Sequence, residues 1–347
     1  MSKQQTSIAW QAPSNIALIK YWGKRGEQLP ENASLSMTLK NAFTTTRMSY
    51  EPSGDGLKLA YLFEGISNAL FTQKVKNYLS RLKEELPFLD QFALEFSSSN
   101  SFPHSTGIAS SASSMAALAL CLVSMEEQVT GKQYSTAAFY QRASHLARLG
   151  SGSASRSLYG AYTTWGKVEG LDETSDCFAS PLASPIDNKF IGMGDAVLLV
   201  SSKPKSVSSS LGHHLMKVHP FASARYQQAE AQLQSLLVCM QLGDFESFAS
   251  IVENEALTLH SLLMTSSPDG LLLKPGTLEI IDAVRKFRKN TGIEVCFTLD
   301  AGPNVHLLYP LYEKEHVLRF INDELKPFCE DEKWIDDETG SGPLRLQ

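Results

Sequence analysis

One carboxylate stands where a general base would be useful. Asp300 follows the apolar segment 294–299 (EVCFTL) and is followed directly by Ala-Gly-Pro. A carboxylate at the end of a strand, beside a glycine turn, can accept a proton from a bound hydroxyl group. The same residue could instead form an Asx turn, because aspartate hydrogen-bonds readily to nearby backbone. Composition alone leaves both interpretations open.

A lysine lies inside an apolar run near the N-terminus. The segment 15–22 reads NIALIKYW, so Lys20 stands among aliphatic and aromatic residues. Such a lysine must reach solvent, pair with an anion or face a cavity. Asn15 is an odd number of positions away, so on a regular strand the two side chains would lie on opposite faces. A site that uses both requires a bend or bulge, and a surface lysine is the simpler alternative.

The segment 98–114 (SSNSFPHSTGIASSASS) connects a strand pattern to an apolar helix pattern. A helix N-terminus has unpaired N–H groups and a partial positive charge, so a Gly/Ser loop there can bind phosphate. Gly107 allows the backbone to approach a ligand. Hydroxyl groups that could donate hydrogen bonds or bind Mg²⁺ belong to Ser105, Thr106, Ser110 and Ser111. The composition also fits a helix N-cap in a solvated loop.

Two further polar segments could hold anionic groups. The segment 150–157 (GSGSASRS) combines small residues with Arg156, whose planar guanidinium suits a carboxylate or a phosphate. The segment 205–213 (KSVSSSLGH) offers several hydroxyl groups. A surface turn and a polar loop are the plainer alternatives. Together, the loop, Lys20, Arg156 and Asp300 suit phosphoryl transfer near a carboxylated substrate.

Strand and helix patterns divide between two halves of the chain. Alternating or β-branched segments predict strands at 6–10, 15–22, 33–39, 43–50, 91–98, 161–165, 195–201, 294–299 and 304–309. Helical spacing predicts helices at 70–86, 111–128, 135–149, 221–241, 244–265, 275–291 and 312–325. The stretch 167–190 is polar and has no clear pattern, so we place a domain boundary there. This order predicts an α+β protein of two lobes.

Composition restricts the class of protein. The chain has 347 residues, which is enough for two domains. A net charge of −6 argues against broad nucleic-acid binding, so an anionic ligand needs a local positive site. Five scattered cysteines without a CxxC motif argue against a disulfide framework and favour the cytoplasm. The N-terminus lacks the apolar core of a signal peptide, and no apolar run could span a membrane. The absence of GxxxxGKS/T and of GxGxxG after a strand argues against a P-loop and a dinucleotide fold.

Four segments resemble motifs of the diphosphomevalonate decarboxylase family. They are APSNIALIKYWGKR, FPHSTGIASSASS, GSGSASRSLYGAY and TLDAGPN, and the resemblance runs from about residue 8 to 310. The family belongs to the superfamily that includes galactokinase, homoserine kinase and mevalonate kinase. The resemblance implies an α+β, two-lobed small-molecule-kinase fold with the active site in the cleft between lobes. Residues 1–187 would form a ribosomal-protein-S5-like domain with the ATP phosphate loop, and residues 188–347 a ferredoxin-like domain with the catalytic Asp.

The resemblance also implies roles for individual residues. Asp300, Lys20 and Arg156 match the family's catalytic aspartate, catalytic lysine and carboxylate-binding arginine. ATP would be held by Pro103, Ser105, Thr106, Gly107, Ala109, Ser110 and Ser111, with Ser111 also binding Mg²⁺. The substrate would be held by Asn15, Tyr21, Lys24, Lys74, Ser151, Ser153, Arg156, Ser208 and Ser209. His260, in LTLHS, matches a helix histidine near the site.

The implied reaction is the ATP-dependent decarboxylation of 5-diphosphomevalonate to isopentenyl diphosphate, a step of the mevalonate pathway of isoprenoid and lipid biosynthesis. The resemblance implies a homodimer that uses ATP and Mg²⁺, and the composition predicts a cytoplasmic protein that binds neither nucleic acid nor membrane. A phosphomevalonate decarboxylase, a mevalonate 3-kinase and a non-catalytic ATP-binding protein are the alternatives. The presence of both Lys20 and Asp300 favours decarboxylation.

The chain departs from the family pattern at two places. The loop reads His104-Ser105-Thr106 where relatives often have small residues, with Ile108 for leucine. Lys74 stands near the place of an arginine that binds the substrate diphosphate. Lysine keeps the charge but lacks the bidentate fork, so the choice between a monophosphate and a diphosphate substrate stays open.

Overall fold

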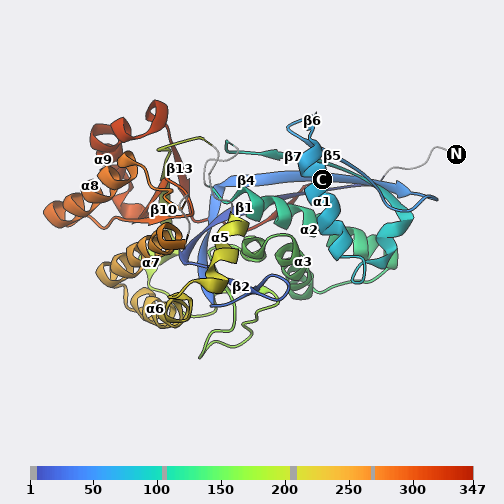
Figure 1. The fold of residues 1–347 in the computed structure, drawn as a ribbon, viewed down its shortest axis with the longest axis horizontal. Coiled ribbons are helices and arrows are strands. Elements are labelled where there is room, and N and C mark those ends of the chain that lie inside the picture. The colour runs from blue at the N-terminus through green and yellow to red at the C-terminus, as the bar shows by residue number, and fades with distance from the viewer. Residues whose placement is uncertain (1–5, 104–107, 204–208, 267–269, 347) are drawn as a thin grey trace.

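Two lobes make up the computed structural model, which describes residues 6–103, 108–203, 209–266 and 270–346. The N-terminal lobe is built on an eight-stranded sheet and the C-terminal lobe on a four-stranded sheet (Figure 1). The chain mixes helices and strands throughout both lobes. The predicted α+β architecture of two lobes is therefore confirmed.

The N-terminal sheet has the strand order β14-β1-β4-β7-β5-β6, with β8 and β9 attached beside β4. Its strands are β1 (Thr6–Ile19), β4 (Ser34–Pro52), β5 (Lys58–Phe63), β6 (Ile66–Ser67), β7 (Phe92–Asn100), β8 (Tyr162–Trp165), β9 (Ala179–Pro181) and β14 (Leu344–Leu346). All pairs are antiparallel except β5 with β7. A separate hairpin joins β2 (Lys24–Arg25) to β3 (Leu29–Pro30).

The predicted breaks in β1 and β4 were wrong, because each is one long strand. The segment 6–10 and the first part of the segment 15–22 merge into β1, which ends at Ile19 and stays paired with β4 through register shifts at Pro13–Asn15 and Ala17–Ile19. The segments 33–39 and 43–50 merge into β4 across a polar stretch. The backbone N–H groups of Lys40 and Asn41 bond there to the Asp337 carboxylate at 2.9 and 2.8 Å. The residues between the two predicted strands are thus kept extended by a distant side chain.

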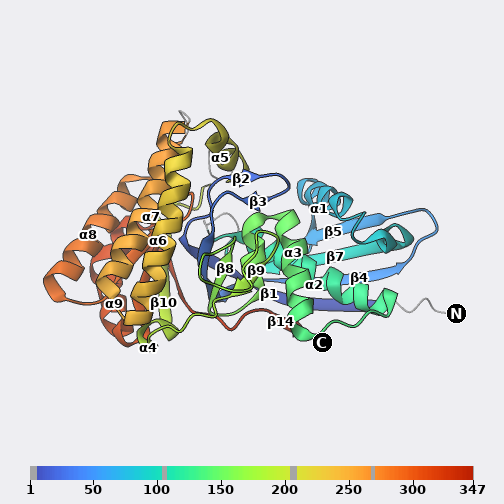
Figure 2. The same cartoon turned by 90° about the horizontal axis from the view of Figure 1, so that it is seen from below.

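Helices α2 (Ser110–Thr130) and α3 (Thr136–Gly150) lie against the N-terminal sheet, with α1 (Ala69–Arg81) beside them (Figures 1 and 2). The apolar run in α2 is buried from Ala116 to Met125. Apolar helix residues that meet a sheet face supply most of the stability of such a layer. The burial fixes α2 so that its first turn opens on the space between the lobes.

The C-terminal sheet has the strand order β11-β12-β10-β13 and is antiparallel throughout. Its strands are β10 (Met193–Leu198), β11 (Cys296–Leu299), β12 (Val305–Pro310) and β13 (Trp334–Glu338). The helices of this half are α4 (Asn188–Ile191), α5 (Ser209–Leu215), α6 (Ala222–Leu242), α7 (Phe245–Ser266), α8 (Pro275–Thr291) and α9 (Lys314–Phe320). A π-helical turn, Ile321–Leu325, continues α9. Short 3₁₀ segments are Pro87–Gln91, Gly152–Leu158, Met216–Val218, Leu311–Glu313, Lys326–Phe328 and Glu330–Glu332.

The polar tail contains two strands that the sequence pattern did not reveal. β13 pairs with β10 in the C-terminal sheet, whereas β14 pairs with β1 in the N-terminal sheet. The end of the chain therefore returns to the first lobe, and the division at residues 187 and 188 stays a prediction. Within the described ranges, no helix combines the length and the apolar character needed to cross a membrane.

Candidate active site

A cavity of about 500 Å³ lies between the two lobes. Twelve of the predicted site residues line it: Asn15, Lys20, Tyr21, Lys24, Lys74, Ala109, Ser110, Ser111, Ser151, Ser153, Arg156 and Asp300. Pro103 is exposed and is not among the lining residues. The predicted residues Ser105, Thr106, Gly107 and Ser208, and the side chain of Ser209, lie outside what the structure describes. The site thus draws on the strand end, the α2 N-terminus, the GSGSASRS segment and the TLDAGPN turn together.

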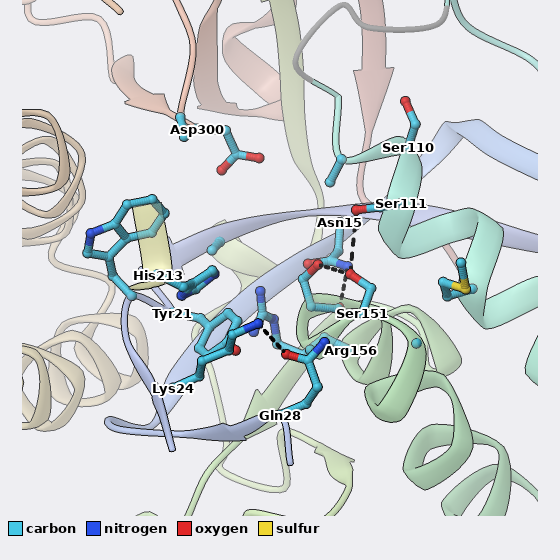
Figure 3. A pocket seen from close by; sticks show the side chains of 18 of the residues that line it. Asn15, Tyr21, Lys24, Gln28, Ser110, Ser111, Ser151, Arg156, His213 and Asp300 are labelled. Atoms are coloured by element: carbon cyan, nitrogen blue, oxygen red, sulfur yellow. Dashed lines mark hydrogen bonds between the residues drawn. The ribbon is translucent and has the colours of Figure 1, made fainter. Parts of the chain in front are cut away.

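Asp300 faces the first turn of α2 across this cavity (Figure 3). Ser110 and Ser111 lie on the α2 side, and Asn15, Ser151 and Arg156 lie between them and Tyr21 (Figure 3). The carboxylate and the hydroxyl-bearing helix start are therefore on opposite sides of one space, where two bound molecules could meet.

Lys20 and Asp300 form an ion pair that joins the lobes. The Lys20 Nζ lies 3.4 Å from Asp300 Oδ1 and donates a second hydrogen bond to the Ala17 carbonyl at 2.6 Å. β1 ends at Ile19, and its register shift at Ala17–Ile19 supplies the irregularity required for Asn15 and Lys20 to share a site. Burial lowers the pKa of Lys20 below 10.5, and the charge of Asp300 opposes that change. The pair places an ammonium beside a carboxylate that is still one-quarter exposed to the cavity.

Arg156 is a buried cation with neutral hydrogen-bond partners. Its Nη1 donates to Ser34 Oγ at 2.8 Å and its Nε donates to Ser36 Oγ. Among the described residues it forms no ion pair within 4.0 Å. Burial lowers the pKa of Arg156 to about 10. A buried guanidinium on the cavity wall, which bonds to two hydroxyl groups and lies over the Trp165 ring, is suited to an incoming carboxylate or phosphate.

Tyr21 presents a buried hydroxyl to the cavity. The Tyr21 oxygen has no hydrogen-bond partner in the described part of the chain. Its ring packs against Trp165, with the ring centres 4.6 Å apart. Gly152 must be a glycine here, because an added Cβ would lie 2.7 Å from Trp165 and 2.9 Å from Tyr21. The small residues of GSGSASRS therefore allow close approach, as predicted, and leave a polar atom that a ligand can satisfy.

The α2 side of the cavity carries neutral donors. Ser151 Oγ donates to Ser111 Oγ at 3.5 Å, and Ser110 lies in the same helix turn. Free N–H groups of a helix start and nearby hydroxyls fit phosphate groups. The described residues contain no cluster of three His, Cys, Asp or Glu that could hold a metal. The Ser111 hydroxyl would be available to a Mg²⁺ ion that binds together with phosphate groups.

Both parts of the chain match models of one protein family. Residues 12–179 match the diphosphomevalonate decarboxylase-like N-terminal domain, and residues 196–342 match the mevalonate 5-diphosphate decarboxylase C-terminal domain. The chain belongs to the diphosphomevalonate decarboxylase family. The predicted resemblance is therefore confirmed over most of the chain.

Relatives and solved structures agree with this family. The diphosphomevalonate decarboxylases of Saccharomyces cerevisiae and Homo sapiens are each 30% identical to the chain, over 89% and 87% of it and 79% and 76% of their own lengths. A mevalonate diphosphate decarboxylase structure from Legionella pneumophila is 32% identical, with a TM-score of 0.80 over 95% of this chain and 100% of that one. MDDEF in complex with MVAPP, AMPPCP and magnesium is 30% identical, with a TM-score of 0.83 over 99% of both chains. The kinase-superfamily fold predicted for the chain is confirmed.

The decarboxylase-family cavity also contains residues that sequence reasoning missed. Gln28, Arg81 and His213 line it. Arg81 ends α1 two helical turns after Lys74, so the helical spacing of 70–86 contained a signal that the two share a face. Gln28 accepts a hydrogen bond from Lys24 Nζ at 2.9 Å (Figure 3). It lies in the short hairpin of β2 and β3, which the sequence pattern did not predict.

The cavity is strongly cationic in a chain that is acidic overall. Five of its described lining residues carry a positive charge, namely Lys20, Lys24, Lys74, Arg81 and Arg156, and Asp300 is the one carboxylate among them. Burial lowers the pKa of Lys24, and the nearby charge of Arg81 adds to the effect. Because the whole chain has a net charge of −6, an anionic ligand needs a local positive site, and this excess of positive charge in the cavity supplies it.

His213 is expected to stay neutral across the physiological pH range. Its Nδ1 accepts a hydrogen bond from the Gly23 N–H at 3.0 Å, which leaves the proton on Nε2. Burial, with the charges of Lys24 and Arg156, lowers its pKa from 6.5 to about 3. Because the unfolded chain takes up a proton near pH 6.5 that the folded chain does not, stability should fall as pH drops below that value. NMR titration should find no protonation of His213 between pH 5 and 8; a midpoint near 6.5 would contradict the described geometry.

Proposed function

We propose that the chain catalyses the ATP-dependent decarboxylation of 5-diphosphomevalonate to isopentenyl diphosphate. Family membership supports the reaction class, and a structure of the Enterococcus faecalis relative concerns ATP binding mediated by mevalonate diphosphate. The observation that carries the proposal for this chain is one cavity that joins the Lys20–Asp300 pair to the buried Arg156. A tertiary alcohol that carries a carboxylate needs a base, a charge partner and a carboxylate clamp.

Asp300 would accept the proton of the substrate's 3-hydroxyl group as that oxygen attacks the γ-phosphorus of ATP. The O–P bond to ADP breaks, and the substrate becomes a 3-phosphate. Lys20 would stabilise the negative charge that develops between the hydroxyl oxygen and the phosphoryl group, since its ammonium lies beside Asp300. Both residues act at one atom, which explains why they lie within 3.4 Å.

Arg156 would hold the substrate carboxylate for the second step. The bond between the carboxylate carbon and C2 breaks, its electron pair forms the C2–C3 double bond, and the C3–O bond breaks with release of phosphate. Alignment of the two breaking bonds lowers the barrier. Loss of CO₂ would be favoured if the bound carboxylate is poorly solvated.

The helix start at Ser110 and Ser111 would hold the ATP phosphates on the side facing Asp300. Bound Mg²⁺ would neutralise phosphate charge during transfer. Tyr21, Lys24 and Ser153 would bind the substrate, and the substrate diphosphate would meet the cations at the α1 side of the cavity. We also propose that the remaining loop residues bind ATP and that Ser208 and Ser209 bind the substrate.

Purified protein mixed with ATP, Mg²⁺ and 5-diphosphomevalonate should yield isopentenyl diphosphate, identified by ³¹P NMR and mass spectrometry. A 3-phosphorylated product that retains its carboxylate would favour a 3-kinase instead. Turnover of 5-phosphomevalonate in preference to the diphosphate would favour a phosphomevalonate decarboxylase.

Lys74 and Arg81 should select the diphosphate. Removing either charge in Lys74→Ala or Arg81→Ala should lower kcat/KM for 5-diphosphomevalonate about three- to tenfold, because both side chains are solvent-exposed and screened. Turnover of 5-phosphomevalonate should change less. Lys76→Ala is the matched control, since Lys76 is exposed on the same helix but does not line the cavity. Equal losses for Lys76→Ala and Lys74→Ala would mean that bulk charge, not a local contact, sets the preference.

The finer properties of the protein stay proposals as well. A cytoplasmic location is supported by five free cysteines, four of them buried. A homodimer is supported by the family resemblance, and light scattering of the purified chain would test it. A mass equal to one chain across the working concentration range would reject the dimer.

A further inference from the structure

The backbone of Lys20 is held by a buried ion pair from the other lobe. Arg225 on α6 and Glu255 on α7 are almost fully buried and bond at 2.7 and 2.6 Å. Glu255 Oε2 accepts the Lys20 backbone N–H at 2.8 Å, and Arg225 Nη2 donates to the Lys20 carbonyl at 3.3 Å. The pair therefore forms hydrogen bonds with both the N–H group and the carbonyl group of Lys20.

The same helix also contacts the backbone of Asp300. His260, five residues after Glu255 on α7, donates from Nε2 to the Asp300 carbonyl at 3.0 Å. At about 1.5 Å of rise per residue, these two helix positions lie only about 7.5 Å apart along the axis. One rigid helix thus contacts the main chain of both members of the Lys20–Asp300 pair.

Stability alone does not explain an ion pair at this place. Buried charges lose hydration, and apolar side chains of similar volume often replace such a pair without loss of stability. β1 ends at Ile19, so the Lys20 backbone has left its strand and still needs partners in a buried setting. Asn32 supplies one further hydrogen bond to the Lys20 carbonyl at 3.1 Å, but the N–H bonds to Glu255.

We propose that Glu255 and Arg225 are positioning residues that hold Lys20 at the separation from Asp300 that the reaction requires. Neither residue lines the cavity; both bond to the Lys20 backbone, and the charge of Glu255 also raises the pKa of Lys20. The inference rests on the proposed function for its kinetic consequences. A lysine displaced by about 1 Å would still bind charge but would miss the developing transition state.

Glu255→Gln keeps the shape of the side chain and removes the charge that anchors Arg225. We expect kcat to fall about 100-fold, with KM for ATP and for 5-diphosphomevalonate changed less than about threefold. Glu253→Gln is the matched control. Glu253 is equally buried on α7, bonds to Arg285 and Arg288 at 3.0 and 2.6 Å, and does not contact Lys20. Its loss should lower the melting temperature with kcat within about twofold of wild type.

A double variant separates positioning from stability. Arg225→Met with Glu255→Leu removes both charges, so the melting temperature should recover relative to Glu255→Gln. Because the Lys20 backbone still lacks its hydrogen bonds to Glu255 and Arg225, kcat should stay low. Recovery of kcat together with the melting temperature would overturn the proposal. If the double variant does not fold, equal kcat values for Glu255→Gln and Glu253→Gln would overturn it.

A structural measurement keeps this inference distinct from the proposed function. If wild-type protein does not decarboxylate 5-diphosphomevalonate, the proposed function fails, but the distance between Lys20 Nζ and Asp300 Oδ1 can still be measured. Crystal structures of wild type and Glu255→Gln should differ in that distance by about 1 Å. An unchanged distance would overturn the positioning role whatever the reaction.

Discussion

Asp300→Asn is expected to lower kcat about 1000-fold while the affinities for ATP and 5-diphosphomevalonate stay close to wild type. The amide has the shape of the carboxylate but cannot accept the hydroxyl proton. It also removes the negative charge that supports protonated Lys20 against the effect of burial, so the pKa of Lys20 should fall further. The base and its charge partner are therefore impaired by one substitution.

Initial rates and isothermal titration calorimetry would separate turnover from binding in this variant. Lys20→Met should cause a loss of similar size, and the double variant should be little worse than either single one, because the two residues serve one proton and one developing charge. Near-normal turnover in Asp300→Asn would refute its role as the base. Additive losses in the double variant would refute the shared role of the pair.

Arg156→Gln is expected to lower kcat/KM for 5-diphosphomevalonate about 100- to 1000-fold, since removing one partner of a buried charge-assisted contact costs about 2–5 kcal/mol. The two serines that bond to Arg156 would remain but carry no charge to match a carboxylate. KM for ATP should change little. Arg148→Gln is the matched control, because Arg148 is buried eight residues earlier and bonds to the backbone of Glu27 and Cys177 instead of lining the cavity. Equal losses for both variants would point to a folding defect rather than a lost carboxylate contact.

Residue types in the sequence predicted the chemistry of the site, but they did not predict the packing that supports it. Lys20 could be singled out because a lysine in NIALIKYW conflicts with its apolar neighbours, and the structure places it in the cavity wall. Gly152 could be expected to permit close approach, and Tyr21 and Trp165 are the side chains that approach. These signals are local, so they are visible in a single segment.

The missed features depend on contacts between distant segments. Glu255 and Arg225 occur in helices, where charged residues ordinarily face water, and the packing of α6 and α7 against the end of β1 buries them. β14 has three residues and becomes a strand because β1 offers an edge. The extension of β4 through Lys40 likewise depends on Asp337, nearly three hundred residues away.

The stoichiometry of the reaction tests the central claim most directly. Released CO₂ and ADP would be measured together in one reaction with wild-type protein, Mg²⁺, ATP and 5-diphosphomevalonate. The cavity that joins Asp300, Lys20 and Arg156 predicts one CO₂ for each ADP. ADP formed without CO₂ would show a kinase that stops at the 3-phosphate and would contradict the account.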